Sequence, residues 1–155
     1  MLKKIFRVTL LLIVCFVFYT ETYAAGLTTG FSEVILEDLE VGKTYSTKEV
    51  AGLPLVVVNT GKEPVDLKLE LLLPDTSELK EGYESIPDLA WIRLEKTDFK
   101  KIMPNEAATT DVLISIPEDK LHLGKKYQVF IWSHTTGGTI GIGLKSKLLL
   151  KIKGE

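Results

Sequence analysis

Residues 65–73 read Val-Asp-Leu-Lys-Leu-Glu-Leu-Leu-Leu, and this stretch decides the class of fold. Valine or leucine occupies every second position, while Asp66, Lys68 and Glu70 fill most of the positions between them. Successive side chains of a β-strand point to opposite faces of a sheet. The stretch therefore predicts a strand with one face on a core and the other mostly in water.

The same period of two recurs along the chain, separated by turn-forming residues. It predicts seven strands, at 33–36, 53–59, 65–73, 90–95, 109–116, 127–133 and 142–152, the first leading through a turn to 44–46. Asn59-Thr60-Gly61 and Thr135 to Thr139 read as turns, the second as a hairpin loop. The longest irregular stretch, 74–88, contains a predicted helical turn at 77–81.

Seven short strands at near-regular spacing are typical of two antiparallel sheets packed face to face. We therefore expect an all-β fold, a seven-stranded antiparallel Ig-like β-sandwich, formed by a single domain over residues 25–155.

The N-terminus has the pattern of a secretory signal peptide over residues 1–24. Three basic residues precede an apolar run from Val8 to Tyr19, and small residues follow at Ala24-Ala25. The run is shorter than the roughly 20 apolar residues that span a bilayer. Export to the periplasm, the cell surface or the medium is the expectation, without a membrane span after cleavage; an uncleaved anchor, or lipidation at Cys15, is the alternative.

The charge balance argues against nucleic-acid binding. The 155 residues hold 19 bases and 21 acids, and residues 25–155 hold 16 bases, 20 acids and no cysteine. A mildly acidic chain lacks the basic surface that binds phosphate backbones. The lack of cysteine after cleavage predicts a domain without disulfides or a blue-copper site.

Residues 56–67 resemble the strand, Asn-x-Gly turn and strand of bacterial Ig-like modules. These modules include the NEW-type domains attached to glycosidases and, more distantly, the pilus-chaperone and major-sperm-protein sandwiches. Trp91-Ile92, the turn at Pro104, Ile116-Pro117 and the Gly124 to Tyr127 stretch fit the same pattern. The resemblance implies an exported, non-catalytic module that binds or spaces other envelope components. Pilus chaperones have two sandwich domains, and this chain has room for one.

The sequence carries few catalytic signals, so we expect no enzyme, no cofactor and no metal. Two histidines, His122 and His134, are present, but a GxSxG nucleophile elbow is missing. Glu118, Asp119 and His122 cluster in one loop as a weak metal candidate, and a pair of acids for glycoside hydrolysis cannot be assigned from sequence. The glycine-rich residues 136–143 lack the lysine and helix of a phosphate loop.

Aromatic residues supply the candidate binding site: Trp91, Trp132, Gln128 and His134. Trp132 shares a strand face with Gln128 and His134, so it points outward if Tyr127, Val129 and Ile131 face the core. Exposed aromatic rings bind protein partners or stack on sugars. The alternative is that one or both tryptophans fill the core.

The lysines at 145, 147, 151 and 153 share the other face of the 142–152 strand from its leucines. We interpret them as the solvated side of an exposed strand, where lysine discourages aggregation, with contact to an anionic polymer as the alternative.

These observations predict a module for protein–protein interaction or structure within the bacterial cell envelope. Its expected partner is another envelope or surface protein. A carbohydrate-binding module that contacts a polysaccharide through its tryptophans is the alternative.

Overall fold

The computed structural model describes residues 26–137 and 141–155. The predicted signal peptide, 1–24, and part of the predicted hairpin loop at 135–139 lie outside these residues. Within the described ranges, no helix is long and apolar enough to cross a membrane.

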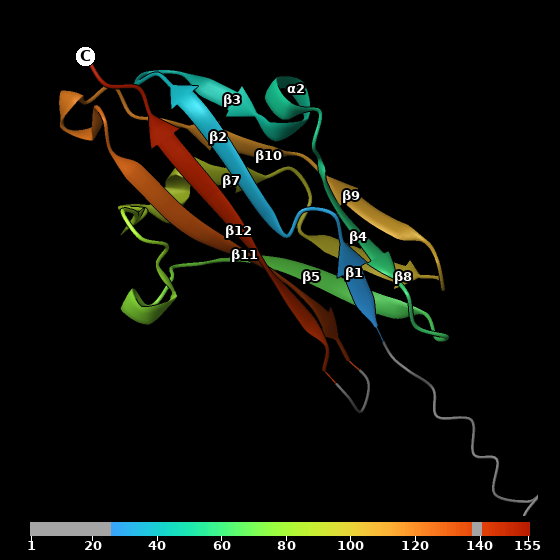
Figure 1. The fold of residues 1–155 in the computed structure, drawn as a ribbon. Helices are drawn as coiled ribbons and strands as arrows, with labels where there is room; N and C mark the ends of the chain where they lie inside the picture. Colours follow the sequence, from blue (N-terminus) through green and yellow to red (C-terminus); the bar gives the residue numbers. More distant parts are fainter. Residues whose placement is uncertain (1–25, 138–140) are drawn as a thin grey trace, which may run out of the picture.

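The chain folds into one large sheet and two small ones (Figure 1). The large sheet has the order β2 (Glu33–Leu39), β12 (Gly143–Ile152), β11 (Lys126–Thr136), β5 (Val65–Leu72), β8 (Asp98–Ile102), and β6 (Glu84–Ser85) also pairs with β11. One small sheet has the order β1 (Leu27–Thr29), β4 (Leu55–Asn59), β9 (Ala107–Thr110). The other has the order β3 (Thr44–Ser46), β10 (Val112–Ser115), β7 (Ile92–Leu94). Short helical segments are α2 (Thr47–Ala51) and the 3-10 turns η1 (Thr76–Glu78), η2 (Leu89–Trp91) and η3 (Lys120–His122).

The core lies between the large sheet and the two small sheets. Alternate residues of the large sheet, such as Leu67, Val129 and Leu148, pack in one cluster with Leu55 of β4 and Ile114 of β10. All five side chains are at most 1% exposed. The prediction of an all-β sandwich is confirmed, because both layers bury one face of alternating apolar residues.

The strand inventory differs from the sequence prediction. β1, β6 and β8 were not predicted, because each is short or interrupts its apolar pattern with charged residues. The strand predicted at 109–116 is two strands, β9 and β10, and the helical turn predicted at 77–81 lies at Thr76–Glu78. Most pairs are antiparallel, but β2 with β12 and β6 with β11 run parallel.

Asp111 marks the point where the chain passes from one small sheet to the other. Its carboxylate accepts hydrogen bonds from the Ser46 hydroxyl at 2.5 Å and from the backbone N–H groups of Lys48 and Val112 at 3.1 and 2.8 Å. Burial alone would raise the pKa of Asp111, but these hydrogen bonds outweigh burial and lower it. Asp111 thereby ties the start of α2 to the start of β10.

The predicted turn after β4 is organised by Asn59, which is 1% exposed. Its amide nitrogen donates to the carbonyls of Glu63 at 2.8 Å and Ile102 at 3.0 Å, and its amide oxygen accepts from the Gly61 N–H at 2.9 Å. One side chain therefore joins the β4–β5 turn to the end of β8.

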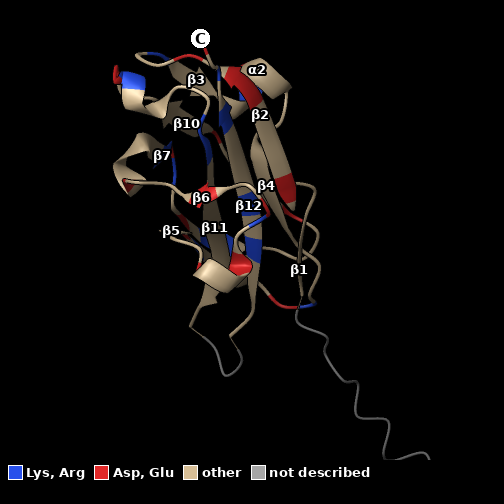
Figure 2. Cartoon of the chain, turned by 60° about the vertical axis from the view of Figure 1, so that its left-hand side comes forward, with Lys and Arg blue, Asp and Glu red and all other residues tan. Residues whose placement is uncertain are grey.

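The position of β12 corrects the interpretation of its lysines. β12 lies between β2 and β11, so it is not an exposed strand. Lys145, Lys147 and Lys151 project from the side of the large sheet that faces away from the core, where they meet acidic side chains of β2 and η1. Figure 2 shows basic positions along β12 and acidic positions along the neighbouring β2.

Candidate functional site

The side of the large sheet that faces away from the core is the candidate site, and we call it the outer face. Along β11 the inner face presents Tyr127, Val129 and Ile131, which belong to the core cluster. The alternate residues Gln128, Phe130, Trp132 and His134 therefore lie on the outer face.

Residues 74–88, which we call the covering segment, lie over the first part of this row. Gln128 holds the segment: its Nε2 donates to the Glu78 carbonyl at 2.9 Å, and its Oε1 accepts from the Lys80 N–H at 2.8 Å. The Ile86 N–H donates to the Gln128 carbonyl at 3.0 Å. Gln128 is 0% exposed, so this predicted binding residue anchors the covering segment.

A second, smaller apolar layer forms on the outer face beside Gln128. Phe130 is 3% exposed and Leu149 is 0% exposed, yet neither belongs to the main core cluster. Ile35 of β2 lies in register with Leu149 and remains 41% exposed. The outer face thus combines an apolar strip with the charged groups around it.

Trp132 and His134 continue the row and are half-buried. Their rings stack with centroids 4.0 Å apart and planes 22° apart. The indole reaches across to β12, where a Cβ at Gly143 would lie 2.5 Å from Trp132 Nε1. Glycine at position 143 therefore permits the observed placement of the ring.

A carboxylate on β5 fixes the histidine. Glu70 Oε2 lies 3.1 Å from His134 Nε2, and Glu70 Oε1 accepts from Lys68 Nζ at 2.6 Å. The hydrogen bond from Lys68 is the main cause of the lowered pKa of Glu70, with a smaller contribution from His134. The aromatic pair is thus bordered by a carboxylate and a lysine.

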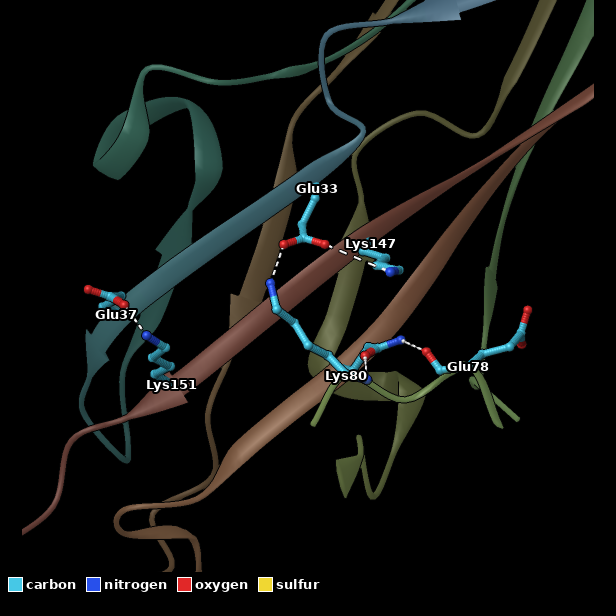
Figure 3. A network of polar contacts seen from close by, with 7 residues as sticks. Glu33, Glu37, Glu78, Lys80, Lys147 and Lys151 are labelled. Carbon is cyan, nitrogen blue, oxygen red and sulfur yellow. Dashed lines mark hydrogen bonds and ion pairs between the residues drawn. The ribbon is translucent and has the colours of Figure 1, made fainter. Parts of the chain in front are cut away.

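Ion pairs surround the rest of the outer face (Figure 3). Glu33 of β2 pairs with Lys80 of the covering segment and lies 3.8 Å from Lys147 of β12. Glu37 pairs with Lys151, and Glu78 of η1 accepts from Lys145 at 2.5 Å. The pKa values of all three glutamates are lowered, and in each case the largest cause is a hydrogen bond from a lysine. The donor is Lys80 for Glu33, Lys151 for Glu37 and Lys145 for Glu78.

An open hollow of about 550 Å³ lies between the covering segment and β12. Three lysines, two glutamates and three other side chains line it: Lys80, Lys145, Lys147, Glu33, Glu78, Ser77, Leu79 and Phe130. The Lys145 ammonium also lies 4.9 Å from the centre of the Phe130 ring. Sequence reasoning missed this hollow, because Glu33 and Lys147 are far apart in the chain and only the parallel β2–β12 pairing brings them together.

Trp91, in contrast, does not lie on the outer face. It is 7% exposed and belongs to the core cluster, where it contacts His122 and Tyr127 edge-to-face at 4.7 and 5.4 Å. His122 Nδ1 and the Tyr127 hydroxyl are hydrogen-bonded at 2.8 Å. For Trp91 the structure agrees with the alternative reading, in which a tryptophan fills the core.

The acidic loop before β11 has structural contacts. Asp119 Oδ1 accepts from the Leu121 N–H at 2.9 Å and thereby caps η3. Over the ranges that the structure describes, no group of three or more histidine, cysteine, aspartate or glutamate side chains is placed to hold a metal ion. Glu118, Asp119 and His122 are thus not brought together as a metal site in those ranges.

The fold is similar to PapD-like domains of known structure, whereas neither a protein-family model nor a curated protein matches the chain by sequence. The ASH/PapD-like domain 7 of human CEP192 has a TM-score of 0.57 at 14% identity, over 83% of this chain and 86% of that one. The chaperone–tip adhesin pre-assembly complex CsuC–CsuE from Acinetobacter baumannii gives 0.51 at 14% identity, over 84% of this chain and 58% of that one.

Two further similar structures come from proteins connected with sugars. A Bacteroides ovatus protein to which carbohydrate binding has been ascribed gives a TM-score of 0.58 at 14% identity, over 82% of this chain and 37% of that one. A family 123 glycoside hydrolase from Clostridium perfringens gives 0.52 at 8% identity, and this chain spans 28% of it. These likenesses show a PapD-like, Ig-like sandwich, and a shared fold does not carry a shared function.

Proposed function

We propose that this protein is a non-catalytic Ig-like module that binds another protein through the outer face of its large sheet. The observation that carries the proposal is the position of Trp132. It is a half-buried aromatic residue two positions after Phe130 on the outer face, with ion pairs on the neighbouring strands at both sides. Protein interfaces have this composition, a central aromatic anchor within a polar rim.

The similar structures support a protein partner, since one of them is a chaperone in complex with a tip adhesin subunit. We further propose that the partner is a component of the bacterial envelope, because the sequence of residues 1–24 has the pattern of an export signal. The site is proposed to act by contact alone. Its titratable groups are in ion pairs and hydrogen bonds with one another rather than facing an enclosed cleft.

The test is a pull-down from the native envelope fraction with the wild-type protein and with Trp132→Ala. We expect the wild type to recover one protein in near-stoichiometric amount. The variant should recover at least about tenfold less of that protein, since hot-spot tryptophans contribute about 2 kcal/mol or more to binding. Leu121→Ala is the matched control, because Leu121 is 78% exposed on η3, away from the outer face.

A second variant separates binding from folding. Gly143→Ala keeps the indole but places a methyl group within 2.5 Å of its Nε1, so the ring must move. We expect reduced recovery with unchanged circular dichroism. Full recovery with both Trp132→Ala and Gly143→Ala would contradict the proposed surface.

Carbohydrate binding is the second candidate, favoured by the likeness to the Bacteroides ovatus protein. The structure places Trp91 and Gln128 in buried positions, which leaves Trp132 and His134 of the four predicted residues for a sugar. His134 stacks on the indole. Titration with envelope polysaccharides, followed by tryptophan fluorescence, tests this candidate; a flat titration removes it.

A further inference from the structure

The hollow beside Phe130 has an excess of positive charge. Three ammonium groups, from Lys80, Lys145 and Lys147, line it together with two carboxylates, from Glu33 and Glu78. Lys145 and Glu78 form a close pair at 2.5 Å. Glu33 pairs with Lys80 through Oε1, so Lys147 shares a carboxylate that is already engaged.

Lys147 is therefore the weakly neutralised cation of the hollow. Its Nζ lies 3.8 Å from Glu33 Oε2, at the outer limit of an ion pair, and its side chain is 38% exposed. Figure 3 shows Glu33 between Lys80 and Lys147, while Lys151 is separately paired with Glu37. An added carboxylate at Lys147 would complete the charge pairing without breaking another pair.

The surroundings favour one carboxylate over a polyanion. A polyanion requires a continuous track of free cations. Here the neighbouring lysines Lys68, Lys145 and Lys151 each pair with a glutamate, at Glu70, Glu78 and Glu37. Residues 25–155 as a whole carry 16 bases against 20 acids, which repels a polyanion.

The distance between the hollow and Trp132 determines how far apart two side chains of a partner segment must be to reach both. Phe130, in the wall of the hollow, and Trp132 are two positions apart on the same face of β11. Residues two apart in an extended chain are separated by roughly 6.5–7 Å. An extended partner segment could thus place one side chain in the hollow and the side chain two positions along on Trp132.

We propose that the hollow receives a single aspartate or glutamate side chain of the partner protein, bound by Lys147, with an apolar side chain two residues away packed on Trp132. This inference rests on the proposed function, because it names the chemistry that the same outer face recognises.

The test is selection of a phage-displayed random nonapeptide library on the full chain, purified as the cell produces it. Displayed peptides are joined to the coat protein by their C-terminus, so side-chain carboxylates are the acidic groups that are selected. On the wild type we expect enrichment of Asp or Glu with an apolar residue two positions away. Resynthesised peptides should bind about two- to fivefold tighter than their Gln or Asn forms, the range for one partly exposed charge pair.

Charge reversal supplies the control. On Lys147→Glu the acidic preference should disappear or invert to Lys or Arg, whereas on Lys151→Glu it should persist, since Lys151 is paired outside the hollow. Lys147→Gln replaces Lys147→Glu if thermal unfolding shows the latter to be misfolded. An acidic preference that survives removal of Lys147, or none on the wild type, overturns the inference.

Two outcomes separate this inference from the proposed function. Apolar peptides that lose binding on Trp132→Ala but show no acidic preference would uphold the Trp132 surface and overturn the carboxylate site. Binding of polygalacturonate that Lys147→Gln and Lys151→Gln weaken equally would show a polyanion surface and also overturn it.

Discussion

At Asn59, one buried amide completes the hydrogen bonds of three backbone groups, two in the β4–β5 turn and one at the end of β8. Asn59→Ala would leave the Gly61 N–H and the carbonyls of Glu63 and Ile102 without this partner. An unsatisfied buried polar group costs about 1–3 kcal/mol. We therefore expect the free energy of unfolding to fall by about 2–3 kcal/mol, measured by urea titration. The exposed neighbour Thr60 is the control, and Thr60→Ala should change it by less than about 0.5 kcal/mol.

Ser146 presents the opposite case. Its hydroxyl and that of Ser133 are buried in the sheet without a hydrogen-bond partner among the described residues. Ser146→Ala removes a polar atom that has lost its contact with water, at the cost of a small cavity. We expect unfolding free energy to stay equal or to rise by about 0.5–1 kcal/mol. A loss above 1 kcal/mol in the same urea titration would indicate that a bound water satisfies the hydroxyl.

Among the elements, the covering segment depends on Gln128 more than on its ion pairs. The ion pairs of Lys80 and Glu78 are exposed, and such pairs contribute little to stability. Gln128 instead makes two partly buried side-chain hydrogen bonds to the segment. In Gln128→Ala we expect the Lys80 amide to lose about tenfold or more of its hydrogen-exchange protection, while the amides of β12 keep theirs. Equal protection at Lys80 in both proteins would contradict this anchoring role.

The elements also show what the sequence could predict. Val65–Leu72 and Gly143–Ile152 alternate strongly, and both were predicted within one residue of their observed ends. Asp98–Ile102 was missed, because a β-bulge shifts its register against β5 and charges occupy three of its five positions. The candidate site was only partly predictable: the period of two placed Trp132, Gln128 and His134 on one face. The covering segment over Gln128 depends on tertiary contacts that no local pattern encodes.

For the whole molecule, the outer-face ion pairs predict acid sensitivity. The pKa values of Glu33, Glu37, Glu70 and Glu78 are lowered, chiefly by hydrogen bonds from lysines. The unfolded chain therefore binds more protons than the folded chain near pH 4.5. The free energy of unfolding rises with pH through this range, and the contribution of these carboxylates is fully present above it. We expect a constant melting temperature from pH 8 to 6 and a decline below about pH 4.5. A melting temperature that rises on acidification to pH 4 would contradict the assignment.

High salt distinguishes the contribution of these ion pairs to the melting temperature from other effects of low pH. Exposed ion pairs are screened at high ionic strength, so the difference in melting temperature between pH 7 and pH 4 should shrink in 1 M NaCl. Glu37→Gln removes one contributor and should also reduce this difference. Lys151→Gln should reduce it as well, because without Lys151 the pKa of Glu37 returns toward its ordinary value and its contribution is lost.

The central place of β12 in the large sheet also has a consequence for how the chain folds. β12 follows every other strand in the sequence, yet it joins β2 to β11, and its Lys151 meets Glu37 across 114 positions. A sheet closed by so distant a partner forms slowly, because the loop entropy is lost before the pairing energy is gained. A ribosome must therefore release nearly the whole polypeptide before β2 finds its neighbour. Until β12 has been released, the large sheet lacks one of its inner strands and β2 has no partner strand.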